Sequence, residues 1–239
     1  MIIALVTGGN AGIGEAVARQ LARQPDHHVI LTSRNLAAGE SVAATIVAEG
    51  HSASCVQLDL TSDASISDVV QHIQEVYGKL DILINNAAIH LDDRSDLSIR
   101  ETFRKTFDTN VFGTAVLTDS LLDLLRRSAA PRVVFVSSSL GSHTLSNDKN
   151  WRHYHVVKKT YKSSKAALNM LVLHYSRALQ DCNGLVNAAC PGPVKTKMSG
   201  YAEGGVTTEV GARRTVELAL LDANGPTATF SDNDGPVPW

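Results

Sequence analysis

The sequence lacks the features that mark several classes of protein. Its three cysteines, Cys55, Cys182 and Cys190, are too few and too scattered for a disulfide framework or a zinc site, and they fit a reducing compartment. No apolar run approaches the roughly 18 residues of a membrane span, and no signal-like segment precedes the first strand-like run. A net charge of −2 gives no attraction to nucleic acid or to an anionic membrane. We therefore expect a soluble cytoplasmic protein without nucleic-acid or membrane partners.

The chain also lacks internal repeats, low-complexity segments and any composition break that would mark a linker. Its 239 residues suit one large α/β domain or two small ones, and 44% hydrophobic residues suffice for a substantial core. We expect a single domain over residues 1–239.

Apolar runs typical of strands alternate with segments of helical periodicity. The expected strands cover residues 2–6, 27–34, 53–60, 80–88, 132–139, 184–190 and 227–230, and the longest expected helices cover 99–127 and 161–180. Near-continuous apolar strands separated by helices indicate a parallel sheet covered on both faces. With a glycine-rich turn after the first strand, they predict a doubly wound α/β fold of the Rossmann type with about seven strands.

That turn, Thr7–Gly14, leads into a segment with the pattern of an amphipathic helix. Its glycines follow G-x-x-x-G-x-G, at Gly8, Gly12 and Gly14, rather than the common dinucleotide fingerprint G-x-G-x-x-G. Glycines allow a ligand to approach the backbone, and a helix N-terminus presents unpaired N–H groups. The turn predicts a pyrophosphate site, although such turns also close units that bind nothing.

The second and third expected strands end where such a site meets the adenosine. An acidic residue after the second strand binds a free ribose 2′-hydroxyl, whereas an arginine favours a 2′-phosphate. Here Ser33 and Arg34 occupy that position, so the sequence predicts NADP(H), unless Arg34 merely faces solvent. Asp59, beside Leu60, is expected to accept from the adenine amino group or to complement the dipole of the next helix, and both readings are compatible.

Tyr161 and Lys165 stand at i and i+4 of an expected helix, so their side chains share one face. A cation within about 4–6 Å favours a phenolate and lowers a tyrosine pKa, which makes the phenol a usable general acid or base. Tyr154 and Lys158 have the same spacing. We prefer Tyr161 because a regular amphipathic helix follows it, whereas Tyr154 lies in a basic stretch without a clear helical face.

Two further polar residues are candidates for the chemistry. Ser138 follows a buried strand, where a hydroxyl reaches the crevice, but Ser137 and Ser139 compete for this role. Asn110 stands in the middle of the long expected helix, where asparagine costs helix propensity. Either a backbone or water contact feeding a proton chain, or an ordinary polar helix face, accounts for it.

Taken together, the motifs resemble the short-chain dehydrogenase/reductase family over essentially the whole chain. They are TGGNAGIG, DL at 59–60, NNAA at 85–88, TNVFG around Asn110, VSSS ending at Ser139, YKSSK at 161–165 and PGPVKT at 191–196. Within the family, the sequences LTSRN, GKLDILINNA and DGPVPW are most similar to the NADPH-dependent, carbonyl-reductase-like branch.

The resemblance implies a role for each candidate. Tyr161 would be the proton donor, Ser138 would hold the carbonyl oxygen because S-x-x-G reads Ser138–Gly141, Lys165 would lower the Tyr161 pKa and bind the ribose, and Asn110 would hold a relay water. The expected cofactor-binding residues are Gly8, Asn10, Gly12, Ile13, Gly14, Ser33, Arg34, Asp59, Leu60, Asn86, Ala87, Tyr161, Lys165, Pro191, Val194 and Thr196. The expected substrate contacts are Ser138, Leu140, Trp151, Tyr161, Met198 and Tyr201.

The sequence departs from the family pattern in three places. Ala88 replaces the usual glycine of N-N-A-G, and Ala11 stands where NADPH-preferring relatives often carry a basic residue. An insertion at about 142–159 is expected to border the substrate pocket; it contains three histidines, but their spacing fits no metal site, and none is expected. A glycine-containing lid is expected at about 195–211.

These observations favour an NADPH-dependent reductase that transfers a hydride to a ketone or aldehyde, reversibly. The alternatives are a non-catalytic NADP-binding sensor or scaffold, and a family member recruited for non-redox chemistry. The expected partners are a small carbonyl or alcohol substrate and further copies of the chain in a homodimer or homotetramer.

Overall fold

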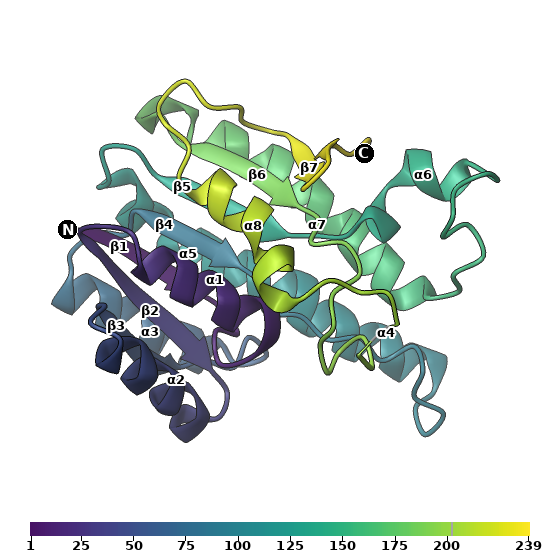
Figure 1. Ribbon diagram of the computed structural model, residues 1–239, viewed down its shortest axis with the longest axis horizontal. Coiled ribbons are helices and arrows are strands. Elements are labelled where there is room, and N and C mark those ends of the chain that lie inside the picture. The colour runs from purple at the N-terminus through teal and green to yellow at the C-terminus, as the bar shows by residue number, and fades with distance from the viewer. Residues whose placement is uncertain (202) are drawn as a thin grey trace.

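An eight-stranded sheet forms the centre of the computed structural model, which describes residues 1–201 and 203–239 (Figure 1). The strand order is β3-β2-β1-β4-β5-β6-β7-β8, and all neighbours are parallel except the final β7–β8 hairpin. The bounds are β1 Ile2–Val6, β2 His27–Ser33, β3 Ala53–Gln57, β4 Ile82–Asn85, β5 Arg132–Val136, β6 Leu185–Ala189, β7 Phe230–Asp232 and β8 Gly235–Pro236. Because the order reverses between β1 and β4, the expected doubly wound sheet is confirmed.

Helices cover both faces of the sheet. They are α1 Gly12–Ala22, α2 Leu36–Ala48, α3 Asp63–Val76, α4 Ile99–Phe107, α5 Thr114–Arg126, α6 His143–Asn147, α7 Lys159–Ala178 and α8 Thr208–Ala219. Residues of α3, α5 and α7 share one hydrophobic core, and residues of α1, α2 and α8 share the other. In Figure 1, α1 and α8 lie on the viewer's side of the sheet. None of the described helices combines the length and the apolar character that a membrane span requires.

Successive residues of β1 serve opposite cores. Ile3 and Leu5 belong to the core with α3, α5 and α7, whereas Ala4 and Val6 belong to the core with α1, α2 and α8. All four are at most 1% exposed. Side chains alternate along a strand, so burial on both faces requires a continuous apolar run. Each buried leucine or isoleucine stabilises the fold by about 1.5–3 kcal/mol, which makes this pattern the strongest predictor of the sheet.

The expected helix over 99–127 is helical throughout but contains a change of pitch. A π-helical turn, Asp108–Gly113, lies between α4 and α5. Gly113 packs so closely on the Leu60 backbone that a Cβ would overlap the Leu60 carbonyl. A π-turn inserts one extra residue into a helix, and such turns are frequent at functional sites. Here the turn carries Asn110.

The last expected strand, residues 227–230, is displaced toward the C-terminus, and a short hairpin brings the described strands to eight rather than about seven. Ala228 has a φ of 57°, which interrupts an extended chain. The Thr229 hydroxyl and backbone N–H both donate to Asn187 Oδ1, at 2.7 and 3.0 Å. These bonds hold the segment beside β6, and regular strand pairing begins only at Phe230.

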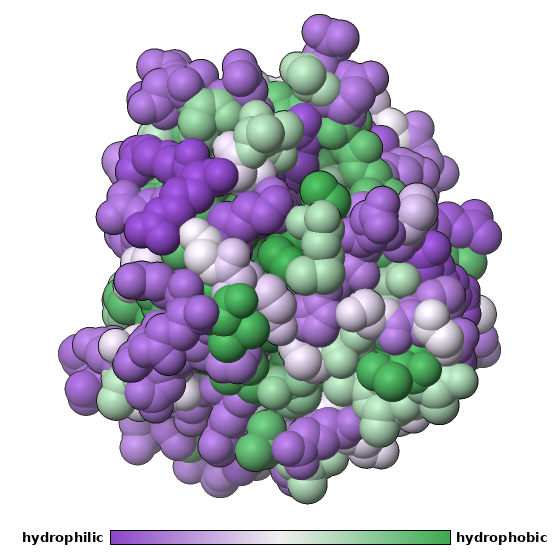
Figure 2. Space-filling model, turned by 90° about the vertical axis from the view of Figure 1, so that its left-hand side faces the viewer, coloured by the Kyte–Doolittle hydropathy of each residue, from purple (hydrophilic) through white to green (hydrophobic). Residues whose placement is uncertain are grey.

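A buried carboxylate ties the amino ends of the strands together. Asp81, just before β4, accepts from the Ile3 N–H at 2.8 Å and the Ser128 hydroxyl at 2.6 Å, and it pairs with Lys79 at 2.9 Å. Figure 2 looks onto this side of the molecule, where hydrophobic residues occur as small separate groups among hydrophilic ones. The bonds of Asp81 hold the amino ends of β1 and β4 together. The cleft lies at the opposite, carboxyl ends of the strands.

Candidate active site

A cleft of about 300 Å³ opens at the carboxyl ends of the strands. The expected site residues that line it are Gly8, Asn10, Gly12, Ile13, Gly14, Ser33, Arg34, Asp59, Leu60, Asn86, Ala87, Tyr161, Lys165, Pro191, Thr196 and Met198. It is also lined by Ala11, Thr32, Leu58, Ala88, Ile89, Thr109, Val136, Ser137 and Lys197. In the described part of the chain, the expected site residues outside this lining are Asn110, Ser138, Leu140, Trp151, Val194 and Tyr201.

The glycine turn presents its backbone to the cleft. Gly8 and Gly12 have φ values of 64° and 60°, a left-handed conformation that glycine adopts without strain. A Cβ on Gly14 would overlap the Gly8 carbonyl and the Asn86 side-chain amide. At the N-cap of α1, Ala11 supplies no side-chain hydrogen bond, which leaves the first N–H groups to a ligand. The turn therefore has the shape and the donors that a pyrophosphate requires.

Thr7 braces this turn, although the sequence analysis assigned it no role. Its hydroxyl accepts from the N–H groups of Asn86 and Ala87, both at 2.9 Å, and donates to the Ile84 carbonyl at 3.2 Å. Asn86 Nδ2 donates in return to the Thr7 carbonyl at 2.8 Å. The expected contact of Asn86 with adenosine stays a prediction, since its side chain also holds the β1 and β4 ends together.

Arg34 and Asp59 line the cleft beyond β2 and β3. Arg34 is exposed, and its backbone carbonyl accepts from Gln57 Nε2 at 3.0 Å. Asp59 Oδ1 accepts from the Thr61 N–H at 2.9 Å and the Thr61 hydroxyl at 2.8 Å. The backbone bond from Thr61 lowers the Asp59 pKa most, and the hydroxyl and the Arg34 charge add to it against the effect of burial. This part of the cleft thus offers a guanidinium beside an ionised carboxylate.

Tyr161 and Lys165 lie one turn apart on α7, as their spacing predicts. Lys165 Nζ lies 5.6 Å from the centre of the Tyr161 ring and donates to the Val136 carbonyl at 2.7 Å. Burial lowers the Lys165 pKa to about 8 and raises the Tyr161 pKa. The loss of solvent around the phenol outweighs the hydrogen bond with Ser138, which acts in the opposite direction on the Tyr161 pKa. The expectation that Lys165 lowers the Tyr161 pKa stays a prediction. The phenol remains protonated at neutral pH.

Two of the three consecutive serines after β5, Ser137 and Ser138, have different hydrogen-bond partners. Ser137 donates to Asn169 Oδ1 at 2.5 Å inside the protein. Ser138 is half-buried, accepts from the Leu140 N–H at 3.2 Å, and is the hydrogen-bond partner that moderates the raised Tyr161 pKa. It therefore joins Tyr161 at the edge of the cleft, although it does not belong to the cleft lining.

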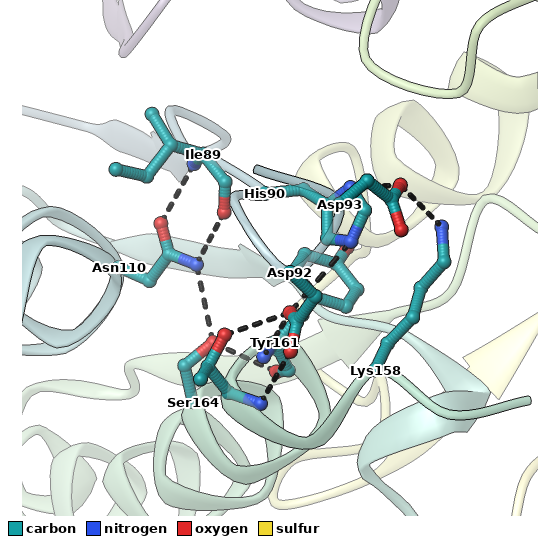
Figure 3. A network of polar contacts seen from close by, with 9 residues as sticks. Ile89, His90, Asp92, Asp93, Asn110, Lys158, Tyr161 and Ser164 are labelled. Carbon is teal, nitrogen blue, oxygen red and sulfur yellow. Dashed lines mark hydrogen bonds and ion pairs between the residues drawn. The ribbon is translucent and has the colours of Figure 1, made fainter. Parts of the chain in front are cut away.

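Asn110 connects the π-turn to the segment after β4 (Figure 3). Its Oδ1 accepts from the Ile89 N–H at 2.8 Å, and its Nδ2 donates to the Ile89 carbonyl at 2.9 Å and to the Ser164 hydroxyl at 3.1 Å. Ser164 donates to the Tyr161 carbonyl at 2.8 Å. Of the two readings left open, the backbone contact is thus present, whereas the relay water stays a prediction.

A second residue that sequence reasoning missed is Asp92, which accepts from the Tyr161 N–H at 3.0 Å. The polar run HLDDRSD, residues 90–96, was its available signal. Such a run fits any exposed loop, and nothing in it indicates that one carboxylate reaches a helix 68 positions further along the chain.

The insertion, expected at about residues 142–159, contains the short helix α6 and a series of turns, and its last residue, Lys159, begins α7 (Figure 1). The Thr144 N–H and hydroxyl donate to the Trp239 carbonyl at 3.0 and 2.7 Å, so the C-terminal segment holds the insertion. Trp151 packs edge-on against His153, with ring centres 5.3 Å apart. Tyr154 lies in a turn outside α7, whereas Tyr161 lies inside it.

The expected lid, residues 195–211, combines a loop with the start of α8, and residue 202 lies outside the described residues. Val194 and Val206 form an isolated bridge that closes the base of the loop. The Val194 side chain is 3% exposed and packs against Gly211. Its side chain is thus used by the fold, and only its backbone remains for the predicted carboxamide contact.

The expected substrate contacts are distributed unevenly. Met198 lines the cleft, whereas Tyr201, with a φ of 57°, keeps 68% of its surface exposed. Leu140 and Trp151 are half-buried and do not belong to the cleft lining. Of these four residues, Met198 alone lines the cleft. The substrate contacts of Leu140, Trp151 and Tyr201 stay predictions.

The fold and the cleft together define a class of protein. A glycine turn at the reversal of strand order is the dinucleotide site of doubly wound α/β proteins, and here a tyrosine and a lysine line the same cleft. The class is that of the dinucleotide-binding oxidoreductases. The sequence pattern of short chain dehydrogenases matches residues 2–205, and the chain belongs to that family, in its carbonyl-reductase-like branch.

Known relatives span nearly the full chain. Carbonyl reductase [NADPH] 1 of Sus scrofa is 34% identical over 276 residues, covering 99% of this chain and 94% of the relative. Short-chain dehydrogenase anuI of Penicillium roqueforti is also 34% identical, over 91% of this chain and 88% of its own length. The crystal structure of NADPH-bound carbonyl reductase from chicken fatty liver superposes with a TM-score of 0.86 at 25% identity, covering 100% and 98% of the two chains.

Proposed function

We propose that this protein is an NADPH-dependent reductase that transfers a hydride to the carbonyl carbon of a ketone or aldehyde, reversibly. The observation that carries the proposal is the protonated Tyr161 phenol, bonded to Ser138 and adjacent to Lys165, at the edge of the cleft. A phenol that holds its proton at neutral pH suits the donor of a reduction.

The cofactor is NADP(H). Gly14 packs against the Gly8 carbonyl at a distance that only a residue without a Cβ allows, which supports a turn shaped for a pyrophosphate. Arg34 is exposed in the lining of the same cleft, which supports its predicted role in binding a 2′-phosphate. The relatives from pig and chicken bear NADPH in their names. Ala11 adds no charge to this region, so the preference for NADPH over NADH depends mainly on Arg34. When bound, NADPH supplies the hydride.

The residues of the chain then perform the proton chemistry. Ser138 and Tyr161 hold the carbonyl oxygen, and Tyr161 donates its proton to that oxygen as negative charge develops there. Lys165 stabilises the resulting phenolate and binds the ribose hydroxyls. Asn110 keeps Ile89 and Ser164 in place and holds the water that returns the proton. Alcohol oxidation uses the same groups in the opposite direction.

Exposed apolar side chains and free thiols bear on the partners and the location of the protein. Phe112 and Met170 are 57% and 65% exposed on the π-turn and α7, which suits pairing of two copies through these helices. Cys55, Cys182 and Cys190 are free thiols, in keeping with a reducing cytoplasm. Met198 favours a substrate that is at least partly apolar.

The test is a panel of ketones and aldehydes, followed by the loss of NADPH absorbance, with the Tyr161→Phe and Tyr154→Phe variants compared. Loss of a general acid costs about 10²- to 10⁴-fold in kcat, so Tyr161→Phe should lose activity. Its affinity for NADPH, measured by fluorescence titration, should stay nearly unchanged. Tyr154→Phe should remain active. Retained turnover in Tyr161→Phe, or NADPH binding without turnover of any carbonyl by the wild type, would contradict the proposal.

A further inference from the structure

The segment between β4 and α4 is fixed at two points, three residues apart. At Ile89 it is held by the Asn110 side chain through both the backbone N–H and the carbonyl. At Asp92 it is attached to the start of α7, which carries Tyr161 (Figure 3). His90 lies between the two anchors, so its position relative to Tyr161 is set by the backbone on either side.

Asp92 performs the capping that α7 does not provide for itself. The N-cap residue Lys158 makes no side-chain hydrogen bond to the helix. Asp92 Oδ1 instead accepts from the Thr160 N–H at 2.9 Å, and its Oδ2 accepts from the Thr160 hydroxyl at 2.7 Å and the Tyr161 N–H at 3.0 Å. Burial alone would raise the Asp92 pKa, but these bonds leave it below the usual value. An ionised carboxylate therefore holds the first N–H groups of the catalytic helix.

The imidazole ring of His90 packs against the Tyr161 ring, and we call this contact the His90 wall. The two rings meet edge-on, with centres 5.5 Å apart and planes at 80°. The His90 side chain is only 8% exposed, and Nε2 is buried without a hydrogen-bond partner among the described residues. Asp92 Oδ2 lies 3.6 Å from Nε2, and Asp93 Oδ2 lies 3.7 Å from Nδ1. The ring thus occupies space that water would otherwise share with Tyr161.

We propose that His90 and Asp92 are positioning residues for Tyr161: Asp92 fixes the backbone from which the phenol projects, and His90 packs against the ring and keeps water from it. The proposal rests on the proposed function, because it concerns the same phenol. Neither residue touches the reacting atoms in this scheme. It follows that the shape of His90 matters more than its nitrogens, and that the acceptor oxygens of Asp92 matter more than its bulk.

The first test compares His90→Ala with His90→Phe. Removing the His90 wall should misplace the phenol and lower kcat by about 10- to 100-fold, with the KM for NADPH changed by less than about twofold. His90→Phe retains a ring of similar shape and should rescue kcat to within about threefold of the wild type. A His90→Ala variant with unchanged kcat, or a His90→Phe variant as impaired as His90→Ala, would overturn the proposal.

The second test uses Asp92→Ala and Asp92→Asn, with Asp96→Ala as a matched control. Asp96 lies in the same segment, but it is 58% exposed and pairs with Arg94 instead of α7. Asp92→Ala should lower kcat by about tenfold or more, Asp92→Asn should recover part of it through its remaining acceptor, and Asp96→Ala should match the wild type. Circular dichroism at the assay temperature confirms that each variant is folded. If folded Asp92→Ala has the kcat of Asp96→Ala, Asp92 does not position Tyr161.

A third measurement needs no turnover and separates this proposal from the proposed function. The ultraviolet absorbance of tyrosinate, taken as the difference between each protein and the same protein with Tyr161→Phe, isolates one of the five tyrosines. In His90→Ala, water should reach the phenol and bring its pKa down toward about 10, whereas His90→Phe should keep it high. A changed titration without carbonyl reduction would retain the positioning role and reject the reductase; an unchanged titration would reject the positioning role alone.

Discussion

Lys165 Nζ lies 5.6 Å from the centre of the Tyr161 ring and is bound at 2.7 Å to the Val136 carbonyl, in surroundings that lower its pKa to about 8. A lysine with this pKa loses its charge as the pH rises through about 8. If Lys165 binds the nicotinamide ribose through a charged ammonium, the affinity for NADPH should be constant below that pH and weaken above it.

The prediction is checked by fluorescence titration of NADPH between about pH 6 and pH 9.5, a window centred near the lowered Lys165 pKa. Lys165→Met should bind NADPH more weakly, by about 1.5–3 kcal/mol for a lost charge-assisted hydrogen bond, and without the alkaline decline. Lys159→Met is the matched control, because Lys159 is exposed at the start of the same helix. An alkaline decline that persists in Lys165→Met would assign it to another group.

Arg34 is expected to decide between the two nicotinamide cofactors. Arg34→Ala should weaken NADPH by about 1.5–3 kcal/mol, or about 10- to 150-fold, because one charged partner of the 2′-phosphate is removed. NADH, which has no phosphate there, should change by less than about twofold. Arg23→Ala, at the exposed C-cap of α1, makes the same change of charge away from the cleft and should affect neither cofactor. Equal losses of NADPH and NADH in Arg34→Ala would contradict the assignment.

The parts of this protein that could be predicted from the sequence are those with a local signal. The apolar runs gave the strands, because burial on both faces demands them, and the spacing of Tyr161 and Lys165 placed both on one helix face. The displaced last strand was not predictable in the same way. It depends on the left-handed backbone of Ala228 and on bonds from Thr229 to Asn187, a residue far away in the sequence.

Within the site, the features that could not be predicted from the sequence depend on contacts between residues far apart in the chain. Ser137 and Ser138 look alike in the sequence, and the structure separates them only because Asn169 engages the hydroxyl of Ser137. Asp92 has the sequence context of an ordinary loop acid, yet it caps α7. The raised Tyr161 pKa has the same origin, since the extent of burial around a phenol is a property of the packed protein and has no local pattern.

Gly14 should tolerate no side chain. In Gly14→Ala the added methyl would overlap the Gly8 carbonyl and the Asn86 amide, so the turn must open and lose its fit to a pyrophosphate. We expect NADPH affinity to fall by about tenfold or more and stability to fall by about 1–3 kcal/mol, as for other overpacked sites. Ala11→Gly removes an exposed methyl from the same turn and should change stability by only a few tenths of a kcal/mol. Wild-type NADPH binding by Gly14→Ala would show that this close approach is not required.

Asp81 should matter for stability and not for chemistry, because it lies at the amino ends of the strands, whereas the cleft lies at their carboxyl ends. Asp81→Ala leaves the Ile3 N–H and the Ser128 hydroxyl without their acceptor and should destabilise the protein by about 3 kcal/mol, measured by urea unfolding. Asp123→Ala, at an 88% exposed position, should change stability by less than about 0.5 kcal/mol. Both variants should retain wild-type kcat where they are folded.

The pH dependence of stability adds a second check on Asp81. Burial would raise the Asp81 pKa, but the bonds from Ser128, Ile3 and Lys79 outweigh it and leave the pKa below its ordinary value. The unfolded chain then binds the proton more readily than the folded protein. The contribution of Asp81 is therefore complete above the ordinary pKa of about 3.9 and is lost as the pH falls through the lower folded value. The difference in unfolding free energy between the wild type and Asp81→Ala should shrink across that acidic range, and a constant difference would show that ionisation of Asp81 is not what stabilises this edge.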